Sequence, residues 1–410
     1  MSTSRILWAI LPRMKQDILK LACLLVVSAC VPKGDGRSSA EPAPKTSNRT
    51  PLRVSLYPWV PAEASFKRFI EYDFERQNPE IDLIIVSLDN EPEYDPKAAH
   101  EALSSSADLL EVDAMILGDL VALGGASHPV VPERDWVPAS KAAATVGGEL
   151  WGVPHWACGY FIITRDATVA SAENVTEFVA ALNKLGSTTP IAGDMKGEWG
   201  TPMLYMDAFQ DSHPDAPLDK VLAQELDAEV LASLRTVASL CPDKDGSSLC
   251  RKDSPGLFVS GSVPAYFGYS ERLNKVLRAG EDPDGIFIRP VPLGANSRPV
   301  LFTDVVVQSA KCKGACSDAA TRFLEYYTAD ATFESVLLSK DVGWDAVPRY
   351  LFPATLSAFQ TPAVKKDKLY QQLEPVAKTA TSYPNTGVFD AVSGEELATK
   401  VWKKLWATPF

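Results

Sequence analysis

The chain has 410 residues, 46% of them hydrophobic, and a formal net charge of −12 at pH 7. It is too long for a single hydrophobic core of ordinary size, so we expect two folded domains. The acidic balance, with no basic stripe, argues against a nucleic-acid-binding function and would suit a cationic small molecule.

The chain begins with a predicted export signal. Two lysines precede an apolar run at residues 21–29, which is too short to cross a bilayer. The run ends in Val-Ser-Ala before Cys30, as in the bacterial lipobox, where the cysteine is lipidated and becomes the mature N-terminus. The alternative is an ordinary cleaved signal with a chance cysteine. We expect a signal peptide at 1–29, a flexible tether at 30–50, and a lipoprotein of the bacterial cell envelope anchored to the membrane by its lipid.

Strand and helix patterns then alternate. A strand pattern at 52–61 precedes a helical segment at 64–78 and a second strand at 81–89. Residues 107–125 begin as a buried strand and continue as a helix that ends at a glycine pair. This alternation predicts an α/β fold with a mostly parallel sheet and helices on both faces.

The rest of the chain continues in the same way. Helical patterns cover 175–185 and 218–240, a strand runs into a helix at 260–280, and a strong strand at 298–310 precedes a helical region. The chain thus forms a first lobe, crosses to a second lobe and then returns. This order predicts a periplasmic binding protein type II-like fold with two discontinuous α/β lobes around a central cleft. We assign residues 51–156 and 300–345 to lobe 1, and 157–299 and 346–410 to lobe 2.

The predicted export indicates that the cysteines form pairs, because an oxidising compartment favours disulfides. Cys241 and Cys250 bracket one polar loop and Cys312 and Cys316 bracket three residues, so each pair can close a local disulfide. A four-cysteine zinc site is the alternative, but the pairs are far apart and the chain has only four histidines, so we expect no metal. Cys158 is left alone, as either a buried hydrophobic residue or a reactive thiol. The predicted crossing places it at the cleft floor.

Several stretches of the sequence match one family in order, over nearly all of the predicted mature chain. Together they resemble thiaminase I, a bacterial enzyme that splits thiamine by base exchange and has the two-lobed solute-binding fold. No single motif is decisive. The stretches are YPWVP (57–61), LLEVDAMIL (109–117), GELWGVPHWACGYFIITRD (148–166), YFGYSE (266–271), LFTDVVVQS (301–309) and RYLFPA (349–354).

The resemblance implies a transferase in which Cys158 is the nucleophile and Glu271 the base. A thiolate that adds to C6 of the pyrimidine helps the thiazole to leave from the methylene, and a second base then replaces it. A free cysteine has a pKa of about 8.5, so a base is needed near neutral pH. The alternative for Glu271 is a carboxylate that favours a helix start. The implied partners are thiamine and a small base such as a pyridine or an amine; thiamine is the substrate, and no cofactor is expected.

The resemblance also implies substrate-binding residues. Asp113 and Asp304, each of which ends a predicted strand, align with carboxylates that contact the aminopyrimidine. Their alternative is the capping of a following helix or loop. The aromatic residues could flank a cationic thiazolium or could be plain core. They are Tyr57, Trp59, Tyr269 and, less securely because its loop is longer here, Tyr94.

The sequence departs from the family around these residues. Trp59 and Phe302 stand where relatives carry tyrosine, and differences also surround the cysteine, at His155, Trp156, Gly159 and Tyr160. These departures put the exact substrate and accepting base in doubt.

Two other functions are alternatives to the transferase. The nearest is a non-catalytic lipoprotein that binds thiamine or another cationic solute for an ABC transporter. A papain-like cysteine hydrolase needs a positioned histidine. Because His155 lies three residues from Cys158 in a predicted strand, the two side chains should project to opposite faces. We expect a monomer.

Overall fold

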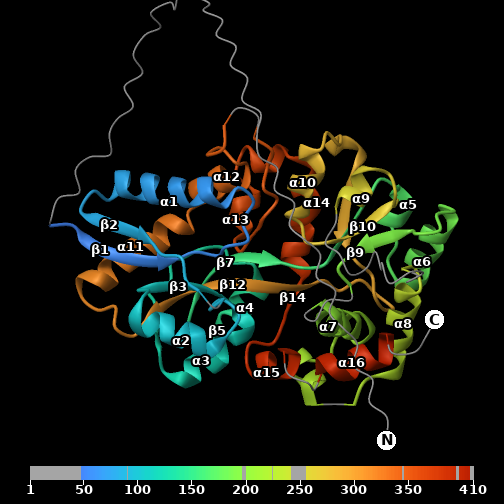
Figure 1. Ribbon diagram of the computed structural model, residues 1–410, viewed down its shortest axis with the longest axis horizontal. Coiled ribbons are helices and arrows are strands. Elements are labelled where there is room, and N and C mark those ends of the chain that lie inside the picture. The colour runs from blue at the N-terminus through green and yellow to red at the C-terminus, as the bar shows by residue number, and fades with distance from the viewer. Residues whose placement is uncertain are drawn as a thin grey trace, which may run out of the picture. The chain divides into compact units, whose positions relative to one another are not determined.

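The computed structural model (Figure 1) describes residues 48–89, 91–195, 200–223, 225–241, 255–343, 346–393 and 397–406. The predicted signal peptide, Cys30, nearly all of the predicted tether, and Cys250 lie outside these residues. Among the residues described, no helix has the length and apolar character needed to cross a membrane.

The larger sheet holds eight strands. They are β1 (Thr50–Ser55), β2 (Ile81–Ile85), β3 (Leu109–Asp113), β4 (Ala126–Ser127), β7 (Val153–Cys158), β12 (Val300–Ser309), β13 (Phe352–Pro353) and β14 (Thr381–Ser382). The main path runs β13, β7, β12, β3, β1, β2, and β4 and β14 also pair with β12. β1 is parallel to β2 and β3, whereas β12 is antiparallel to both β3 and β7.

The smaller sheet holds four strands in the order β11, β8, β10, β9. They are β8 (Phe161–Thr164), β9 (Ile191–Gly193), β10 (Ala265–Gly268) and β11 (Phe287–Pro290), and β5 (Thr145–Val146) and β6 (Glu149–Leu150) form a separate hairpin. In the smaller sheet β9 and β10 are parallel and the other pairs are antiparallel. Both sheets are therefore mixed, and the prediction of a mostly parallel sheet was wrong. The sequence shows the order of strands along the chain, not which strands pair.

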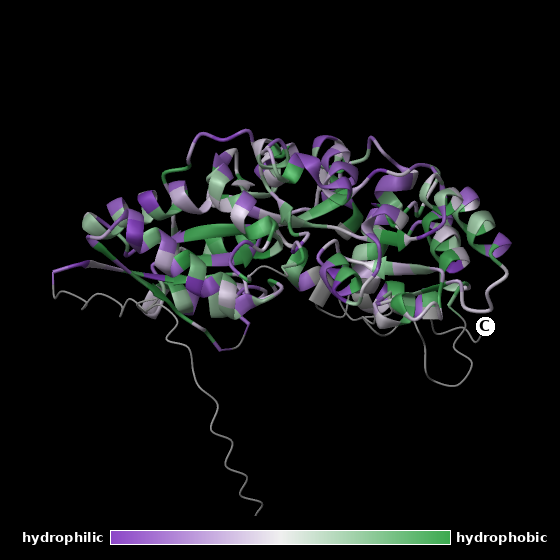
Figure 2. Ribbon diagram, turned by 90° about the horizontal axis from the view of Figure 1, so that it is seen from above, coloured by the Kyte–Doolittle hydropathy of each residue, from purple (hydrophilic) through white to green (hydrophobic). Residues whose placement is uncertain are grey.

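Helices cover the larger sheet on opposite sides (Figure 1). They are α1 (Glu63–Gln77) and α11 (Ala315–Tyr327), which pack against β2 and β1, and α2 (Pro96–Ser105) and α4 (Pro138–Ala143), which pack against β3 and β12. Near these lie η1 (Ala114–Ile116), α3 (Leu117–Leu123), α12 (Asp330–Leu337), α13 (Leu356–Phe359) and α15 (Val388–Ser393). The hydropathy colouring shows apolar strands inside and polar helix faces outside (Figure 2).

The smaller sheet has its own set of helices. They are α5 (Ala167–Ala170), α6 (Val175–Lys184), α7 (Gly200–Ser212), α8 (Ala228–Ala238), α9 (Gly256–Val259), α10 (Arg272–Arg278), α14 (Lys368–Thr379) and α16 (Leu397–Trp406), with short turns η2 (Leu218–Ala223), η3 (Pro283–Gly285) and η4 (Val364–Lys366). The prediction of a single helix over 218–240 was wrong. This segment is divided because Asp227 begins α8 as an N-cap, and its side chain accepts hydrogen bonds from the backbone N–H groups of Glu229 and Val230.

The strand predicted over 52–61 is shorter than expected. β1 ends at Ser55, and α1 begins at Glu63. Pro58 and Pro61 have no backbone N–H, so they cannot continue a strand ladder. The intervening YPWVP stretch is a loop at the carboxyl end of β1.

The buried face of α1 shows what holds this helix. Phe66, Ile70 and Phe74 recur at a spacing of four residues and are fully buried. The Phe74 ring packs against Phe323 and Tyr326 of α11, with both ring centroids at 5.4 Å. This contact joins the first helix to one that lies almost 250 residues later in the chain.

Removing this ring should destabilise the protein. Phe74→Ala leaves a cavity between α1 and α11, and we expect the free energy of unfolding to fall by about 3–5 kcal/mol. Tyr72→Ala on the same helix is the matched control: its side chain is 71% exposed, so its effect should stay within about 0.5 kcal/mol. Urea unfolding followed by circular dichroism measures both. Equal losses for the two variants would contradict the packing described.

Candidate active site

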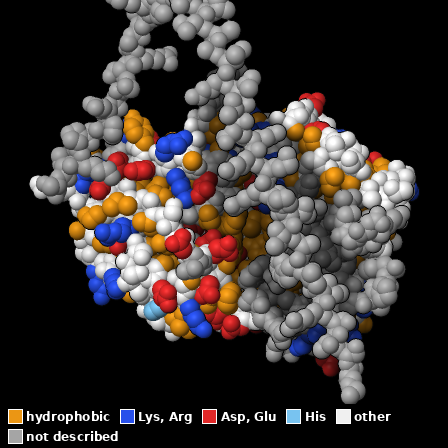
Figure 3. Space-filling model, in the orientation of Figure 1, with side chains coloured by type: hydrophobic (Ala, Val, Ile, Leu, Met, Phe, Trp, Pro, Cys, Tyr) orange, Lys and Arg blue, Asp and Glu red, His pale blue; other side chains and the backbone are white. Residues whose placement is uncertain are grey.

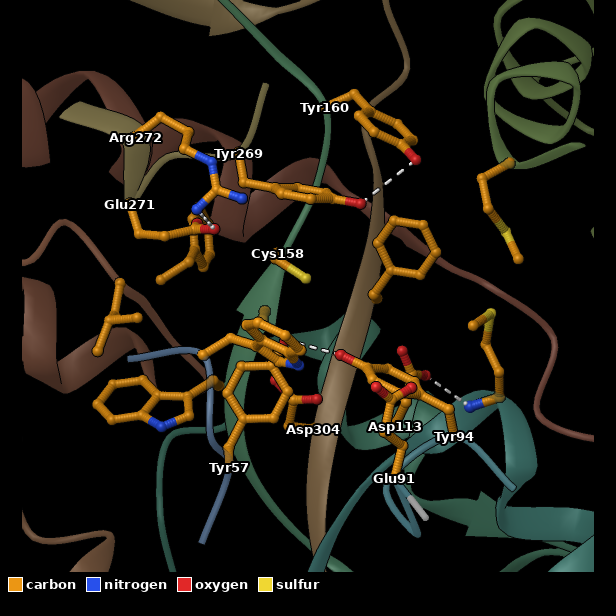
Figure 4. A pocket seen from close by; sticks show the side chains of 18 residues that line it. Tyr57, Glu91, Tyr94, Asp113, Cys158, Tyr160, Tyr269, Glu271, Arg272 and Asp304 are labelled. Atoms are coloured by element: carbon orange, nitrogen blue, oxygen red, sulfur yellow. Dashed lines mark hydrogen bonds and ion pairs between the residues drawn. The ribbon is translucent and has the colours of Figure 1, made fainter. Parts of the chain in front are cut away.

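A cavity of about 360 Å³ lies where loops and strands from distant parts of the chain meet. Near the middle of the face shown in Figure 3, acidic side chains gather beside an apolar hollow. The close view in Figure 4 shows how the side chains converge. Every catalytic and substrate-binding residue predicted from the sequence lines this cavity: Cys158, Glu271, Tyr57, Trp59, Tyr94, Asp113, Tyr269 and Asp304.

Cys158 is the last residue of β7 and is a free, half-buried cysteine. Its sulfur lies between Glu271 on one side and the two aspartates on the other (Figure 4). Burial raises the pKa of the Cys158 thiol well above its usual value, and the carboxylates of Asp304, Glu271 and Asp113 raise it further. Arg272 opposes this shift. In the free protein the thiol is therefore protonated at neutral pH and needs a base to become a nucleophile.

Glu271 stands just before α10, at the carboxyl end of β10. Its side chain makes no capping hydrogen bond to the helix, although its place at the N-cap of α10 agrees with the alternative of a carboxylate favoured at a helix start. Its carboxylate lines the cavity, is 12% exposed, and lies 3.3 Å from the Arg272 guanidinium. It is placed to accept a proton from a group held in the cavity.

Asp113 and Asp304 lie opposite each other in the antiparallel ladder of β3 and β12. Asp113 also caps the next turn, because its Oδ1 accepts from the Met115 backbone N–H at 2.9 Å. Asp304 lies in the middle of β12, so the prediction that it ends a strand was wrong. Burial raises the pKa of Asp113 to about 7. The pKa of Asp304 rises well above its usual range, through burial and then through repulsion from Asp113. The pair therefore presents one protonated and one ionisable carboxyl group near neutral pH.

Aromatic rings form two walls around these polar groups. Tyr57 and Tyr94 approach with their hydroxyl oxygens 3.3 Å apart. On the other side Tyr269 stacks on Tyr160 at 5.3 Å between centroids, with the Tyr269 hydroxyl 3.4 Å from that of Tyr160. Trp59 is 55% exposed, so it is not a core residue. Flat apolar walls with carboxylates between them suit a planar, cationic heteroaromatic ligand.

His155 does not line the cavity. The β7–β12 ladder contains a bulge, in which Trp156 pairs with Asp304 and Pro154 with Val305, so that His155 is the extra residue. Its Nδ1 lies 2.7 Å from Glu111, and its ring stacks on Tyr327 at 3.6 Å. His155 therefore forms no dyad with Cys158, because its ring is held by Glu111 and Tyr327 away from the cavity. The bulge also interrupts the regular strand alternation on which the sequence argument relied.

The other cysteines are accounted for where the structure describes them. Cys312 and Cys316 form a disulfide with an S–S distance of 2.02 Å. This pair therefore offers no thiolates to a zinc ion. Cys241 is also disulfide-bonded, and the predicted partner Cys250 lies outside the described residues.

Sequence reasoning missed three polar residues that line the cavity: Glu91, Tyr160 and Arg272. Arg272 follows Glu271 directly, so its position next to the predicted base was a usable signal. Glu91 lies in the acidic stretch EPEYD and has a φ of 46°, in the left-handed region that favours glycine. No pattern in the sequence indicates that Glu91 reaches the cavity.

Comparison with known proteins places the geometry in context. No family model matches the chain. Thiaminase-1 of Paenibacillus thiaminolyticus is 24% identical over 391 residues, covering 88% of this chain and 88% of that protein. The chain is a distant homologue of thiaminase I.

Solved structures agree on the fold of this thiaminase I homologue. Clostridium botulinum thiaminase I in complex with thiamin matches with a TM-score of 0.67 and 21% identity, over 86% of this chain and 100% of that one. The GacH receptor of Streptomyces glaucescens, whose structures include an acarbose complex, matches with a TM-score of 0.62 and 16% identity, over 88% and 100%. The predicted type II periplasmic binding protein fold is confirmed. The exact lobe boundaries stay a prediction.

The raised pKa of Cys158 has a measurable consequence. Because the thiol stays protonated until the pH passes its raised pKa, iodoacetamide at pH 7 should label it about tenfold more slowly, or slower still, than an unperturbed cysteine of pKa about 8.5. The rate should keep rising as the pH is raised beyond about 9. Intact mass spectrometry over a pH series gives the rates, and N-acetylcysteine is the reference. A plateau reached below about pH 8 would contradict this description.

Proposed function

We propose that the protein is a thiaminase I-like transferase that cleaves thiamine at its methylene bridge and transfers the pyrimidine to another base. One observation carries the proposal. Cys158, which is a free thiol, opens into a cavity that also holds the Glu271 carboxylate and the paired aspartates Asp113 and Asp304. A carrier that only holds its ligand needs neither the thiol nor the base.

In the first half-reaction the Cys158 proton passes to Glu271 as the sulfur adds to C6 of the pyrimidine. The π electron pair of the ring's C5=C6 double bond moves to C5, and the C5–C6 single bond remains. From there this pair forms a double bond to the methylene carbon as the bond to the thiazolium nitrogen breaks. The thiazole leaves as a neutral molecule with that bonding pair. The pyrimidine stays attached to sulfur with an electrophilic methylene exposed.

In the second half-reaction a base such as pyridine adds its nitrogen lone pair to the methylene carbon. The π electrons of the exocyclic double bond return to C5 and re-form the C5=C6 double bond as the C6–S bond breaks, and the departing sulfur recovers its proton from Glu271. Charge balances: one cation and one neutral base give another cation and a neutral thiazole. Covalent catalysis thus divides one slow displacement into two easier steps.

The aspartate pair suits the aminopyrimidine. In its protonated form Asp304 can donate to a ring nitrogen, and Asp113 as a carboxylate can accept from the exocyclic amino group. The Asp304 proton would stabilise the electron density that builds on the ring, while Asp113 would hold the amino group in place. A cationic thiazolium placed among these carboxylates would also offset the negative charge that opposes ionisation of Cys158. The cavity becomes competent for thiolate chemistry once such a cation is bound.

The second candidate is a non-catalytic carrier of thiamine or another cationic solute that serves an ABC transporter. The likeness in fold to the GacH receptor, whose structures were solved in the unliganded form and in complex with acarbose, favours it. Carrier and transferase share the fold and the acidic cavity. They differ in what Cys158 and Glu271 do.

Base exchange tests the proposal directly. With thiamine and pyridine the protein should release free thiazole and form a pyrimidinylmethyl-pyridinium product, seen by liquid chromatography with mass detection. Cys158→Ser should lower the exchange rate by about a thousandfold or more, because the covalent step is lost. It should bind thiamine as well as the parent does.

Matched variants sharpen this test. Glu271→Gln, which keeps the shape of the side chain but cannot accept the proton, should lower kcat by about 100-fold or more. Ser270→Ala changes the neighbouring residue, whose buried hydroxyl donates to the Tyr350 carbonyl at 2.7 Å, and should keep most of the activity. Thiamine returned unchanged by the parent protein would instead favour the carrier. Full turnover in Cys158→Ser would exclude the nucleophile assignment.

We also propose that the protein is exported and anchored in the cell envelope through a lipid on Cys30. The lipobox-like run before that cysteine supports the proposal. Expressed in a bacterium with its full N-terminus, the protein should partition into detergent, and its N-terminal peptide should begin at a diacylated Cys30. Cys30→Ala should release it from the membrane fraction. A soluble parent protein with an unmodified N-terminus would contradict the proposal.

A further inference from the structure

The YPWVP stretch, residues 57–61, carries two cavity side chains yet belongs to no helix or strand. We call it the aromatic loop. With two prolines it has few N–H groups to form a ladder, so contacts from outside the loop must fix its backbone. Both of its ends meet a buried charged side chain.

Glu111 of β3 holds the start of the aromatic loop. Its Oε2 accepts from the Tyr57 backbone N–H at 2.8 Å. The Glu111 side chain is 0% exposed and does not line the cavity. Glu111 belongs to the LLEVD stretch, in which sequence reasoning singled out Asp113 alone.

Glu111 is a buried carboxylate with donors on both oxygens. Besides Tyr57, the Tyr327 hydroxyl donates to Oε2 at 3.0 Å and His155 lies 2.7 Å from Oε1. Burial lowers the pKa of His155, so at neutral pH its ring is uncharged and gives its Nδ1–H to the carboxylate. A buried charge persists only with such partners, and here they come from the aromatic loop, β7 and α11.

Arg349 holds the other end of the aromatic loop. Its Nε donates to the Pro61 carbonyl at 2.7 Å, and the same guanidinium donates to the Val336 carbonyl at 2.8 Å. Asp341 accepts from both terminal nitrogens, at 2.6 and 2.5 Å. The arginine is 0% exposed and belongs to the RYLFPA stretch. It also does not line the cavity.

We propose that Glu111 and Arg349 are positioning residues that clamp the aromatic loop at its two ends and thereby set the Tyr57 and Trp59 rings in the cavity. With thiamine as the ligand, the inference rests on the proposed function. Three stretches far apart in sequence thus meet in the fold, because Glu111 and Arg349 hold the two ends of the aromatic loop. It acts on ligand binding, because neither anchor reaches the reacting atoms.

The test separates positioning from general stability. Glu111→Gln should raise KM for thiamine by roughly tenfold, the scale of one hydrogen bond to a charged group, while kcat changes less than about threefold. In a Tyr57→Ala background the same substitution should have almost no further effect on KM, because the ring that it positions is gone. Arg349→Lys should likewise raise KM for thiamine, and it should have almost no further effect on KM in a Trp59→Ala background. Additive effects in both cycles would overturn the proposal.

A ligand-independent measurement keeps the proposal testable if the protein does not turn over thiamine. Hydrogen exchange of a peptide covering the aromatic loop should show protection of the Tyr57 amide, reduced at least about tenfold in Glu111→Gln. Asp211→Asn is the matched control: it alters another buried carboxylate that accepts backbone N–H groups, from Leu293 and Arg298, away from the loop. It should leave both the protection and KM unchanged. Equal loss of protection in both variants, or none in Glu111→Gln, would overturn the clamp even if exchange activity is proven.

Discussion

The arrangement of the site depends on the double pairing of β12. This strand forms antiparallel ladders with β3 on one side and β7 on the other. The ladders bring Asp304, Asp113 and Cys158 together from positions spread over almost 200 residues of chain. Main-chain hydrogen bonds fix these positions, so the distances between the side chains are set by the fold and not by a mobile loop. The loops then add Glu271 and the aromatic rings to this fixed base.

The electrostatic properties of the cavity follow from this convergence of side chains. Several carboxyl groups share a small apolar cavity, and each one disfavours the ionisation of its neighbours. In the empty site these carboxyl groups therefore keep their protons to a higher pH than usual. A positively charged ligand would reduce the repulsion among them. Cys158 experiences the same field, which keeps a free thiol in a relatively unreactive state until a ligand changes the balance. The raised pKa of the Cys158 thiol and the proposed binding of a cationic ring would therefore have the same cause, the field of these carboxyl groups.

Much of this could be predicted from the sequence, and particular residues show where the prediction reached its limit. The α/β class and the strong strand at 298–310 followed from periodicity, and the order of six short stretches indicated the family resemblance before any coordinates. All eight predicted site residues lie in one cavity. Their chemical roles depend on the proposed function. Glu111 and Arg349 were not predicted, because a buried charge is recognised only when its partners, distant in sequence, are known.

His155 shows a second limit. Its spacing from Cys158 gave an argument about strand faces, but regular alternation does not hold where a bulge occurs. Bulges depend on the register between two strands, and the sequence of one strand does not contain that register. The mixed sheets, the divided helix after Leu218 and the position of Asp304 within β12 have similar origins. In each case tertiary pairing or a local cap decided what the pattern left open.

The same bulge has a consequence for the parity of β7. Four steps along the chain, from Pro154 to Cys158, are matched by three steps along β12, from Val305 to Phe302. An even number of steps along β7 is therefore matched by an odd number along β12. The regular alternation of side chains between the two faces does not hold from one end of β7 to the other. Pro154 pairs with the buried Val305, whereas Cys158 pairs with Phe302 beside the cavity. A single inserted residue thus places on opposite faces two side chains, those of Pro154 and Cys158, that a regular strand would place on the same face.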